Sequence, residues 1–381
     1  MNIIPYSCQD INEDDISAVV SVLKSEYVTQ GPAIPAFEDA IAKYCGTPYA
    51  VAVSSGTAGL HLACLALGIG EGDNVWTSPI SFVASANCAL YVGAKVDFVD
   101  VDPSTGNMSL ELLEQKLIQA KKKGKLPKLL VVVHLSGRSV DMQKVSKLSK
   151  EYGFLVMEDA AHALGAEYNN KKVGSCEFSD ICLFSFHPLK SITTGEGGML
   201  MTKNKLLAEN LKLLRTHGIT KEAAKFENKN EGGWYYEMQQ LGFHYRLTDI
   251  QAALGTSQMK RLDKFISKRR QVAKTYEEKL KSGSLLLPPV DDKSSWHLYI
   301  IQFKDTDRKS AYNKIKAAGI SANVHYIPIH LQPYYRKLGF KAGDFPNAEL
   351  FYSRALSIPI FPGLTEQQQN HIIKTISDIL K

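Results

Sequence analysis

Short apolar runs alternate with amphipathic stretches over roughly the first 245 residues of the chain. Residues 129–134 (Leu-Leu-Val-Val-Val-His) are apolar almost without interruption, which is typical of a strand covered on both faces. Regular alternation of strands and helices favours a mostly parallel α/β sheet with right-handed crossovers. The predicted strands are 50–53, 74–77, 95–100, 129–134, 154–158, 181–186 and 198–202. Residues 12–25, with Asn12 as a helix cap, predict an amphipathic helix before the first strand.

The pattern changes after about residue 245. A long charged helix is predicted at 249–281, followed by a turn-rich stretch and an apolar strand-like segment at 296–303. A helix near 308–318, an extended segment at 320–327 and a closing helix at 365–380 complete the chain. We therefore predict two domains, a large α/β domain at 1–248 and a smaller α+β domain at 249–381.

Composition excludes several classes of protein. The chain has 381 residues, 44% of them hydrophobic and 22% charged, as in an ordinary globular protein. The net charge is +6, and the densest basic run, 121–125, contains no aromatic residues, so nucleic acid is not an expected partner. The six cysteines show no zinc-type spacing, and no metal site is predicted. Neither a signal peptide nor an apolar run long enough to span a membrane is visible, so a cytoplasmic location is expected.

Lys190 is the first candidate for chemistry. It follows the apolar strand 181–186 and a turn at Pro188, and a glycine cluster lies just beyond it. A lysine at the end of a buried strand can have its pKa lowered by burial and can then form a Schiff base with an aldehyde. A solvated loop lysine is the alternative when the residue is taken alone.

Two further features also follow predicted strands, where open α/β sheets bind ligands. Residues 54–59 (Ser-Ser-Gly-Thr-Ala-Gly) open an apolar helix, whose free N–H groups can bind a phosphate, although a plain tight turn explains them equally. Asp159 ends the strand 154–158 and could hold a protonated pyridine nitrogen, or could simply cap a helix.

Ser185 and Phe82 complete the set. The Ser185 hydroxyl could add a phosphate contact, or bond to the backbone within its strand. Phe82, just beyond the strand 74–77, could stack on a flat ring, or pack in the core. Together with Lys190 and Asp159, these residues supply the parts that a pyridoxal-phosphate (PLP) enzyme needs.

The sequence resembles the sugar aminotransferases of the DegT/StrS type, which are fold-type-I PLP enzymes that aminate nucleotide-linked keto sugars. The match runs nearly from end to end. The motifs that carry it are Thr-Gln-Gly-Pro at 29–32, Ser-Gly-Thr at 55–57, Glu-Asp-Ala-Ala-His at 158–162, Phe-Ser-Phe-His at 184–187, Lys190, Gly-Glu-Gly-Gly at 195–198, Arg-Thr-His-Gly at 215–218, Arg-Leu-Thr-Asp-Ile at 246–250 and Val-His-Tyr-Ile-Pro at 324–328.

The resemblance implies roles for individual residues. Lys190 would bind the cofactor as a Schiff base and later move the proton, while Asp159 would pair with the pyridine nitrogen. Phe82 would stack on the ring, and His162 would lie near the ring hydroxyl. The phosphate would be held by Gly56, Thr57 and Ser185.

The same resemblance implies a homodimer with shared active sites. In the family, a Gly-aromatic-Asn-aromatic-Arg loop of the neighbouring subunit completes the phosphate site. This chain departs from that pattern, because residues 242–246 read Gly-Phe-His-Tyr-Arg. His244 could still donate a hydrogen bond to the partner's cofactor, or could be a simple interface residue.

Four stretches are similar to the branch of the family that acts in pseudaminic acid biosynthesis. They are residues 79–87, 135–141, 185–194 and 293–299. This similarity implies transfer of the amino group of L-glutamate to C4 of a UDP-linked 4-keto-6-deoxy-N-acetylhexosamine. Amination of a GDP- or dTDP-linked sugar, or at C3, is the alternative within the family.

Four residues are candidates for contacts with the sugar or the nucleotide: His187, Arg215, His325 and Tyr326. Arg215 could meet a diphosphate, but a surface arginine is equally consistent with its position. His325 and Tyr326 could instead pack in the small domain.

Two functions other than transamination are compatible with this fold, a keto-sugar dehydratase and a scaffold protein. Keto-sugar dehydratases of the same fold are associated with histidine in place of the lysine, and Lys190 argues against them. A scaffold protein that has kept the fold without catalysis is disfavoured by the retained Lys190, Asp159 and phosphate loop.

Overall fold

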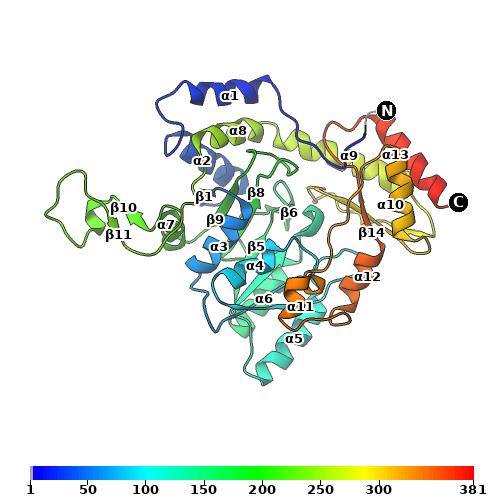
Figure 1. Cartoon of the computed structure of the whole chain (residues 1–381), viewed down its shortest axis with the longest axis horizontal. Coiled ribbons are helices and arrows are strands. Elements are labelled where there is room, and N and C mark those ends of the chain that lie inside the picture. The colour runs from blue at the N-terminus through cyan, green and yellow to red at the C-terminus, as the bar shows by residue number, and fades with distance from the viewer. Residues whose placement is uncertain (1–2) are drawn as a thin grey trace.

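The computed structural model describes residues 3–381, and its centre is a seven-stranded sheet (Figure 1). The strand order is β1-β9-β8-β5-β4-β2-β3. Only β9 is antiparallel to its neighbours; the other pairings are parallel, as predicted. The strands are β1 (Tyr49–Val53), β2 (Asn74–Thr77), β3 (Lys95–Phe98), β4 (Leu129–Val133), β5 (Leu155–Asp159), β8 (Ile181–Ser185) and β9 (Gly198–Thr202).

Helices cover both faces of this sheet, which explains its continuous apolar strands. In β4, Leu129 and Val131 pack with helices α3 and α7, whereas Leu130 and Val132 pack with α5 and α6. Alternate side chains of one strand therefore enter two different cores. The helices of this region are α2 (Ala33–Cys45), α3 (Gly56–Ala66), α4 (Ala84–Tyr91), α5 (Leu110–Lys122), α6 (Met142–Tyr152) and α7 (Lys205–Leu214).

The prediction of one long helix at 249–281 is wrong, because the structure forms two helices there. Helix α8 (Asp249–Met259) and helix α9 (Leu262–Lys279) are separated at Lys260 and Arg261. The Arg261 guanidinium bonds to the carboxylates of Asp10 and Asp15 at the beginning of the chain. Because α8 packs against α1 (Glu13–Leu23) and α2, it lies beside the large sheet's helices. The predicted division of the chain at 248/249 stays a prediction.

A smaller antiparallel sheet forms the C-terminal part, in the order β12 (Leu285–Leu286), β13 (Tyr299–Phe303) and β14 (Ala355–Ile358). It packs with α10 (Arg308–Ala317) and α13 (Glu366–Ile379). The predicted extended segment at 320–327 joins no strand ladder and makes only single bridges, to Ile4 and Ser357. The remaining elements there are α11 (Pro333–Lys337) and α12 (Pro346–Arg354).

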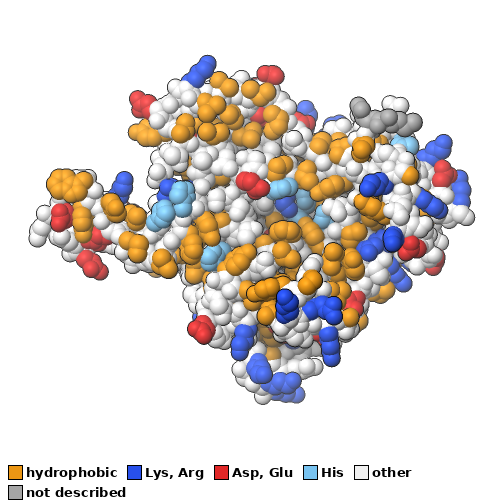
Figure 2. All heavy atoms as spheres, in the orientation of Figure 1, with side chains coloured by type: hydrophobic (Ala, Val, Ile, Leu, Met, Phe, Trp, Pro, Cys, Tyr) orange, Lys and Arg blue, Asp and Glu red, His pale blue; other side chains and the backbone are white. Residues whose placement is uncertain are grey.

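An arm leaves the body of the molecule after α7, and the sequence did not indicate it (Figure 1). Its two strands, β10 (Ile219–Thr220) and β11 (Glu237–Met238), pair with each other, as do β6 (Glu167–Tyr168) and β7 (Lys171–Lys172) elsewhere. Apolar side chains of the arm, including Trp234 and Leu241, are exposed, and so are those along α1 (Figure 2). The apolar side chains of the amphipathic helix predicted at 12–25, among them Ile16, Val20 and Leu23, are therefore exposed in the single chain.

No helix within residues 3–381 is long and apolar enough to cross a membrane. The predicted cytoplasmic location stays a prediction.

Candidate active site

A cavity of about 520 Å³ opens at the carboxyl ends of the parallel strands, between the large sheet and the segment 323–326. All of the predicted site residues line it except Arg215 and His244. The topology explains this convergence, because parallel strands deliver their C-terminal residues to one edge of the sheet.

Lys190 lies in the turn after β8, is partly buried and lines the cavity. Its backbone N–H donates to the carbonyl of His187 at 2.9 Å, which fixes the turn. Burial lowers the pKa of Lys190 to about 8, and the Asp159 carboxylate opposes that effect. About one tenth of the amine is therefore neutral and nucleophilic at pH 7, far more than for an ordinary lysine.

Asp159 is the last residue of β5, and its carboxylate is held by a chain of hydroxyls. Oδ2 accepts a hydrogen bond from Ser85 Oγ at 2.6 Å, and Ser81 Oγ lies 2.6 Å from Ser85 Oγ. Since Ser85 has one hydroxyl proton and donates it to Asp159, Ser81 must donate to Ser85. Oδ1 accepts the backbone N–H of Ala161 at 3.2 Å. These bonds stabilise an ionised carboxylate that faces the cavity.

Helix α3 provides an anion site at its N-terminus. Ser55 caps the helix, and its Oγ accepts the N–H of Ala58 at 3.1 Å. Within the described chain, the preceding N–H groups of Gly56 and Thr57 have no protein acceptor, and both residues line the cavity. A Cβ on Gly56 would lie 3.1 Å from Ser185 Cβ, so Ser185 is directly beside this turn. The N–H groups, the hydroxyls and the helix dipole together fit a phosphate.

Phe82 stands at the cavity with 58% of its surface exposed, although a large aromatic side chain is usually buried. Its ring centroid lies 6.4 Å from that of Tyr326. An exposed ring on the cavity wall suits stacking on a flat ligand.

His162 is a neutral imidazole whose tautomer the structure defines. Its Nδ1 accepts the backbone N–H of Ser136 at 3.3 Å, so Nε2 carries the proton, 3.1 Å from the Tyr326 hydroxyl. Burial places the pKa of His162 well below its ordinary value, and the charge of Lys190 adds to this effect.

The two remaining histidines predicted for the substrate differ in setting. His325 is buried, its Nδ1 lies 2.8 Å from Ser357 Oγ, and burial lowers its pKa to about 4. His187 is exposed at the cavity mouth and therefore remains available to a ligand.

Arg215 does not reach the cavity, which argues against the predicted contact with a diphosphate. Its guanidinium bonds to the Glu38 carboxylate at 2.5 Å and to the carbonyl of Ala52 at 2.7 Å. It therefore ties α7 to α2 and β1 as a structural ion pair.

His244 also lies outside the cavity of its own chain. It is exposed, with Nε2 3.0 Å from an Arg246 nitrogen and its ring 5.4 Å from His217. A role at a partner's cofactor stays a prediction.

Sequence reasoning missed Ser85 and Ser136, which bond to Asp159 and His162, and His297, which lines the cavity. The motif 79–87 contains Ser85, but a serine within a helix gives no signal of a buried bond to a distant aspartate. Ser136 contributes only its backbone, and His297 comes from the segment before β13 in the C-terminal part of the chain.

The arrangement fits pyridoxal phosphate. A phosphate matches the unpartnered N–H groups at the start of α3, and the flat ring matches the exposed face of Phe82. A protonated ring nitrogen matches Asp159, and the aldehyde matches the partly neutral Lys190 amine.

Comparison with known proteins agrees with this chemistry. Residues 9–377 match the model of the DegT/DnrJ/EryC1/StrS aminotransferase family. The chain is 38% identical to the UDP-4-amino-4,6-dideoxy-N-acetyl-beta-L-altrosamine transaminase of Campylobacter jejuni, over 99% of this chain and 98% of the relative. It is 37% identical to the spore coat polysaccharide biosynthesis protein SpsC of Bacillus subtilis, over 99% and 97% of the two chains.

Solved structures show the same fold. Helicobacter pylori PseC, an aminotransferase involved in the biosynthesis of pseudoaminic acid, superposes with a TM-score of 0.90 at 33% identity, covering 99% of each chain. The PLP form of the putative sugar aminotransferase Spr1654 of Streptococcus pneumoniae gives a TM-score of 0.89 at 28% identity, covering 99% of this chain and 98% of that one. The chain therefore belongs to the DegT/DnrJ/EryC1/StrS aminotransferase family and is a PLP-dependent sugar aminotransferase.

Proposed function

We propose that this enzyme transfers the amino group of L-glutamate to C4 of a UDP-linked 4-keto-6-deoxy-N-acetylhexosamine, as in pseudaminic acid biosynthesis. The observation that carries the transamination chemistry is the cavity that joins Lys190, Asp159 and the N-terminus of α3. The choice of sugar is supported by the likeness to the C. jejuni transaminase and to H. pylori PseC. Amination of a GDP- or dTDP-linked sugar, or at C3, is the alternative.

Lys190 and Asp159 are the catalytic residues in this proposal. Bound pyridoxal phosphate supplies an aldehyde for the Lys190 amine and a ring that accepts an electron pair. Lys190 removes the proton from Cα of the amino donor, and in the second half-reaction delivers a proton to the sugar carbon that receives nitrogen. Asp159, whose carboxylate is oriented by Ser85, would hold the protonated ring nitrogen through a charge-assisted hydrogen bond.

The other cavity residues bind and orient. The N–H groups of Gly56 and Thr57 and the Ser185 hydroxyl would hold the phosphate, and Phe82 would cover one face of the ring. The Nε2–H group of His162 faces the Tyr326 hydroxyl, and the imidazole would lie near the hydroxyl of the pyridoxal ring. We propose His187, His325 and Tyr326 as the residues nearest the sugar or its nucleotide.

We also propose that the enzyme is a homodimer with His244 at the partner's phosphate site. Exposed apolar side chains on α1 and on the arm support an interface between two copies (Figure 2). His244 lies close to the base of that arm, bridged to Thr216.

A panel of keto sugars tests the substrate. Purified protein loaded with PLP is incubated with L-glutamate and with UDP-, GDP- and dTDP-linked keto sugars, and amino sugars are identified by mass spectrometry and NMR. We expect a C4-aminated product from the UDP-linked 4-keto-6-deoxy-N-acetylhexosamine. Product only from dTDP- or GDP-linked sugars would refute the substrate proposal.

Lys190→Ala is the matched control for that panel. It keeps the cavity and lacks the amine, so we expect noncovalent cofactor binding and no amino sugar. Full aminotransferase activity in this variant would contradict the role of Lys190.

A further inference from the structure

Two loops from distant parts of the sequence meet beside the active-site cavity. One is 135–138, which follows β4, and the other is 291–297, which precedes β13. The N–H of Ser295 donates to the Gly137 carbonyl at 3.1 Å, and the N–H of His297 donates to the Ser136 carbonyl at 2.9 Å. A Cβ at residue 137 would lie 2.1 Å from Ser295 Oγ, so only glycine permits this approach.

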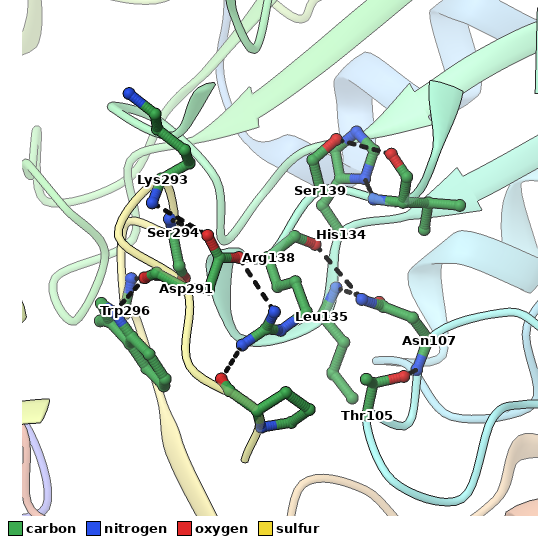
Figure 3. Close-up of polar contacts among 12 residues, drawn as sticks. Thr105, Asn107, His134, Leu135, Arg138, Ser139, Asp291, Lys293, Ser294 and Trp296 are labelled. Carbon is green, nitrogen blue, oxygen red and sulfur yellow. Dashed lines mark hydrogen bonds and ion pairs between the residues drawn. The ribbon is translucent and has the colours of Figure 1, made fainter. Parts of the chain in front are cut away.

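Arg138 links the two loops through its guanidinium group (Figure 3). Its guanidinium lies 3.1 Å from the Asp291 carboxylate, bonds to the Pro289 carbonyl, and lies over the Trp296 ring at 5.8 Å. Asn107 holds the other side, because its Oδ1 accepts the Leu135 N–H at 2.9 Å. The backbone of 135–138 is therefore fixed in relation to the small domain.

The junction places two imidazoles side by side. Ser295 Oγ donates to the backbone carbonyl of His162 at 2.7 Å, and the rings of His162 and His297 lie 4.4 Å apart at 41°. His162 is bound by Ser136 and Tyr326, whereas the His297 ring makes no hydrogen bond within residues 3–381. The His297 ring is therefore held in place by its backbone, and within the described residues its nitrogens have no hydrogen-bond partner.

His297 is 4% exposed and lines the cavity. Its Nδ1 is fully buried without a partner in the part of the chain that the structure describes, which leaves Nε2 as the ring nitrogen for a ligand in the cavity. Burial places the pKa of His297 well below its ordinary value, and the charge of Lys190 adds to this effect, so the ring is neutral. A buried N–H without an acceptor is rarer than an unpaired acceptor, so the proton belongs on Nε2.

We propose that His297 is a further substrate-binding residue, whose Nε2–H donates a hydrogen bond to an oxygen of the bound substrate. This inference rests on the proposed function. The oxygen belongs either to the α-carboxylate of the amino donor or to the keto sugar, which occupy the same cavity in turn. A neutral donor suits both, because an N–H group can donate a hydrogen bond to a carboxylate oxygen as well as to a carbonyl or hydroxyl oxygen of the sugar.

Two substitutions separate hydrogen bonding from packing. His297→Phe keeps a ring against His162 and removes the donor, whereas His297→Gln restores an N–H donor near the position of Nε2. A lost hydrogen bond to a charged group corresponds to a loss of about 10- to 100-fold. We expect His297→Phe to raise the KM for one substrate by about that factor, with a smaller change in kcat, and His297→Gln to recover most of the loss.

Each half-reaction is measured alone to identify the oxygen. The first half-reaction uses L-glutamate. Binding of the amino donor is measured separately with 2-methyl-L-glutamate, which has no Cα proton to lose, through the change in cofactor absorbance. The second uses the keto sugar with the aminated cofactor. Weaker binding of 2-methyl-L-glutamate assigns the oxygen to the carboxylate, and a raised KM for the sugar alone assigns it to the sugar.

Controls keep the two proposals distinguishable. His330→Phe alters a buried histidine that does not line the cavity, and the Tm of each apo variant checks folding. Wild-type protein that fails to react with any amino donor would refute the proposed function itself. If the wild type reacts, unchanged kinetics in His297→Phe would overturn the role of His297. So would equal losses in the Phe and Gln variants, which indicate packing alone.

Discussion

At the scale of single residues, the reactivity of the active-site side chains depends on how deeply the protein buries each polar group. Lys190 and Asp159 have ordinary side chains, and their chemistry arises from a shared buried cavity and from the Ser81–Ser85 hydroxyl chain. The sequence identified the lysine and the aspartate through their positions after strands. It could not identify Ser85, because its bond to Asp159 spans 74 positions of the chain.

The buried amine of Lys190 should lower the free energy of unfolding of the apo-protein. Its pKa falls from 10.5 to about 8 on folding, so the native apo-protein binds fewer protons than the unfolded chain between these values. Burial of the charged amine therefore opposes folding fully below pH 8, on the order of 3 kcal/mol, and stability rises as pH increases from 8 to 10.5. We expect apo Lys190→Met to unfold at higher urea concentration than the apo wild type at pH 7.

The difference between the two proteins should narrow steadily as pH is raised to 10, because the wild-type amine loses its charge. Urea unfolding at pH 7, 9 and 10 measures this dependence. Equal stability at pH 7 would show that the Lys190 amine is solvated in the native state.

At the scale of secondary-structure elements, hydrophobic patterning predicted where strands occur better than how they pair. The antiparallel direction of β9 was not predicted, since an apolar run carries no information on direction. The break between α8 and α9 was also missed, because it depends on Asp10 and Asp15 binding Arg261 from across the chain. The arm with β10 and β11 gave no periodic signal.

The N-terminus of α3 should be sensitive to a single methyl group. In Gly56→Ala, the new Cβ would lie 3.1 Å from Ser185 Cβ and 3.3 Å from its Oγ, and it would crowd the phosphate site. We expect PLP affinity to fall about 10-fold, the effect of losing one hydrogen bond to a charged group. Pyridoxal, which lacks the phosphate, should bind almost as well as it does to the wild type.

Gly70→Ala is the matched control, because its Cβ would have only the Val92 carbonyl nearby, at 4.0 Å. Equilibrium dialysis with both ligands gives the ratio of affinities. An equal loss of PLP and pyridoxal in Gly56→Ala would indicate a general distortion and not a phosphate site.

At the scale of the whole molecule, the exposed apolar surfaces of α1 and the arm support the proposed homodimer (Figure 2). If His244 completes the partner's site, Lys190→Ala and His244→Ala subunits should complement each other when they are mixed. In the mixed dimer, one site combines an intact lysine with an intact histidine. Random assortment would then restore about one quarter of wild-type activity.

Each variant alone should be impaired, and subunit exchange is checked by mass spectrometry of the intact dimer. If His244 acts within its own chain, every site of the mixed dimer lacks one residue and no activity returns. Wild-type activity of His244→Ala alone would reduce this histidine to an interface residue.

The sequence by itself determined the α/β class, the family and the cofactor, because these depend on local patterns: apolar strands, a small-residue helix start, and single polar residues after strands. The tertiary structure decided which of the candidates share a cavity. It placed Arg215 outside that cavity, in an ion pair with Glu38 that joins residues 177 positions apart, and it brought His297 to His162 from a distant part of the chain. Such contacts depend on packing between distant segments, and local patterning does not encode them.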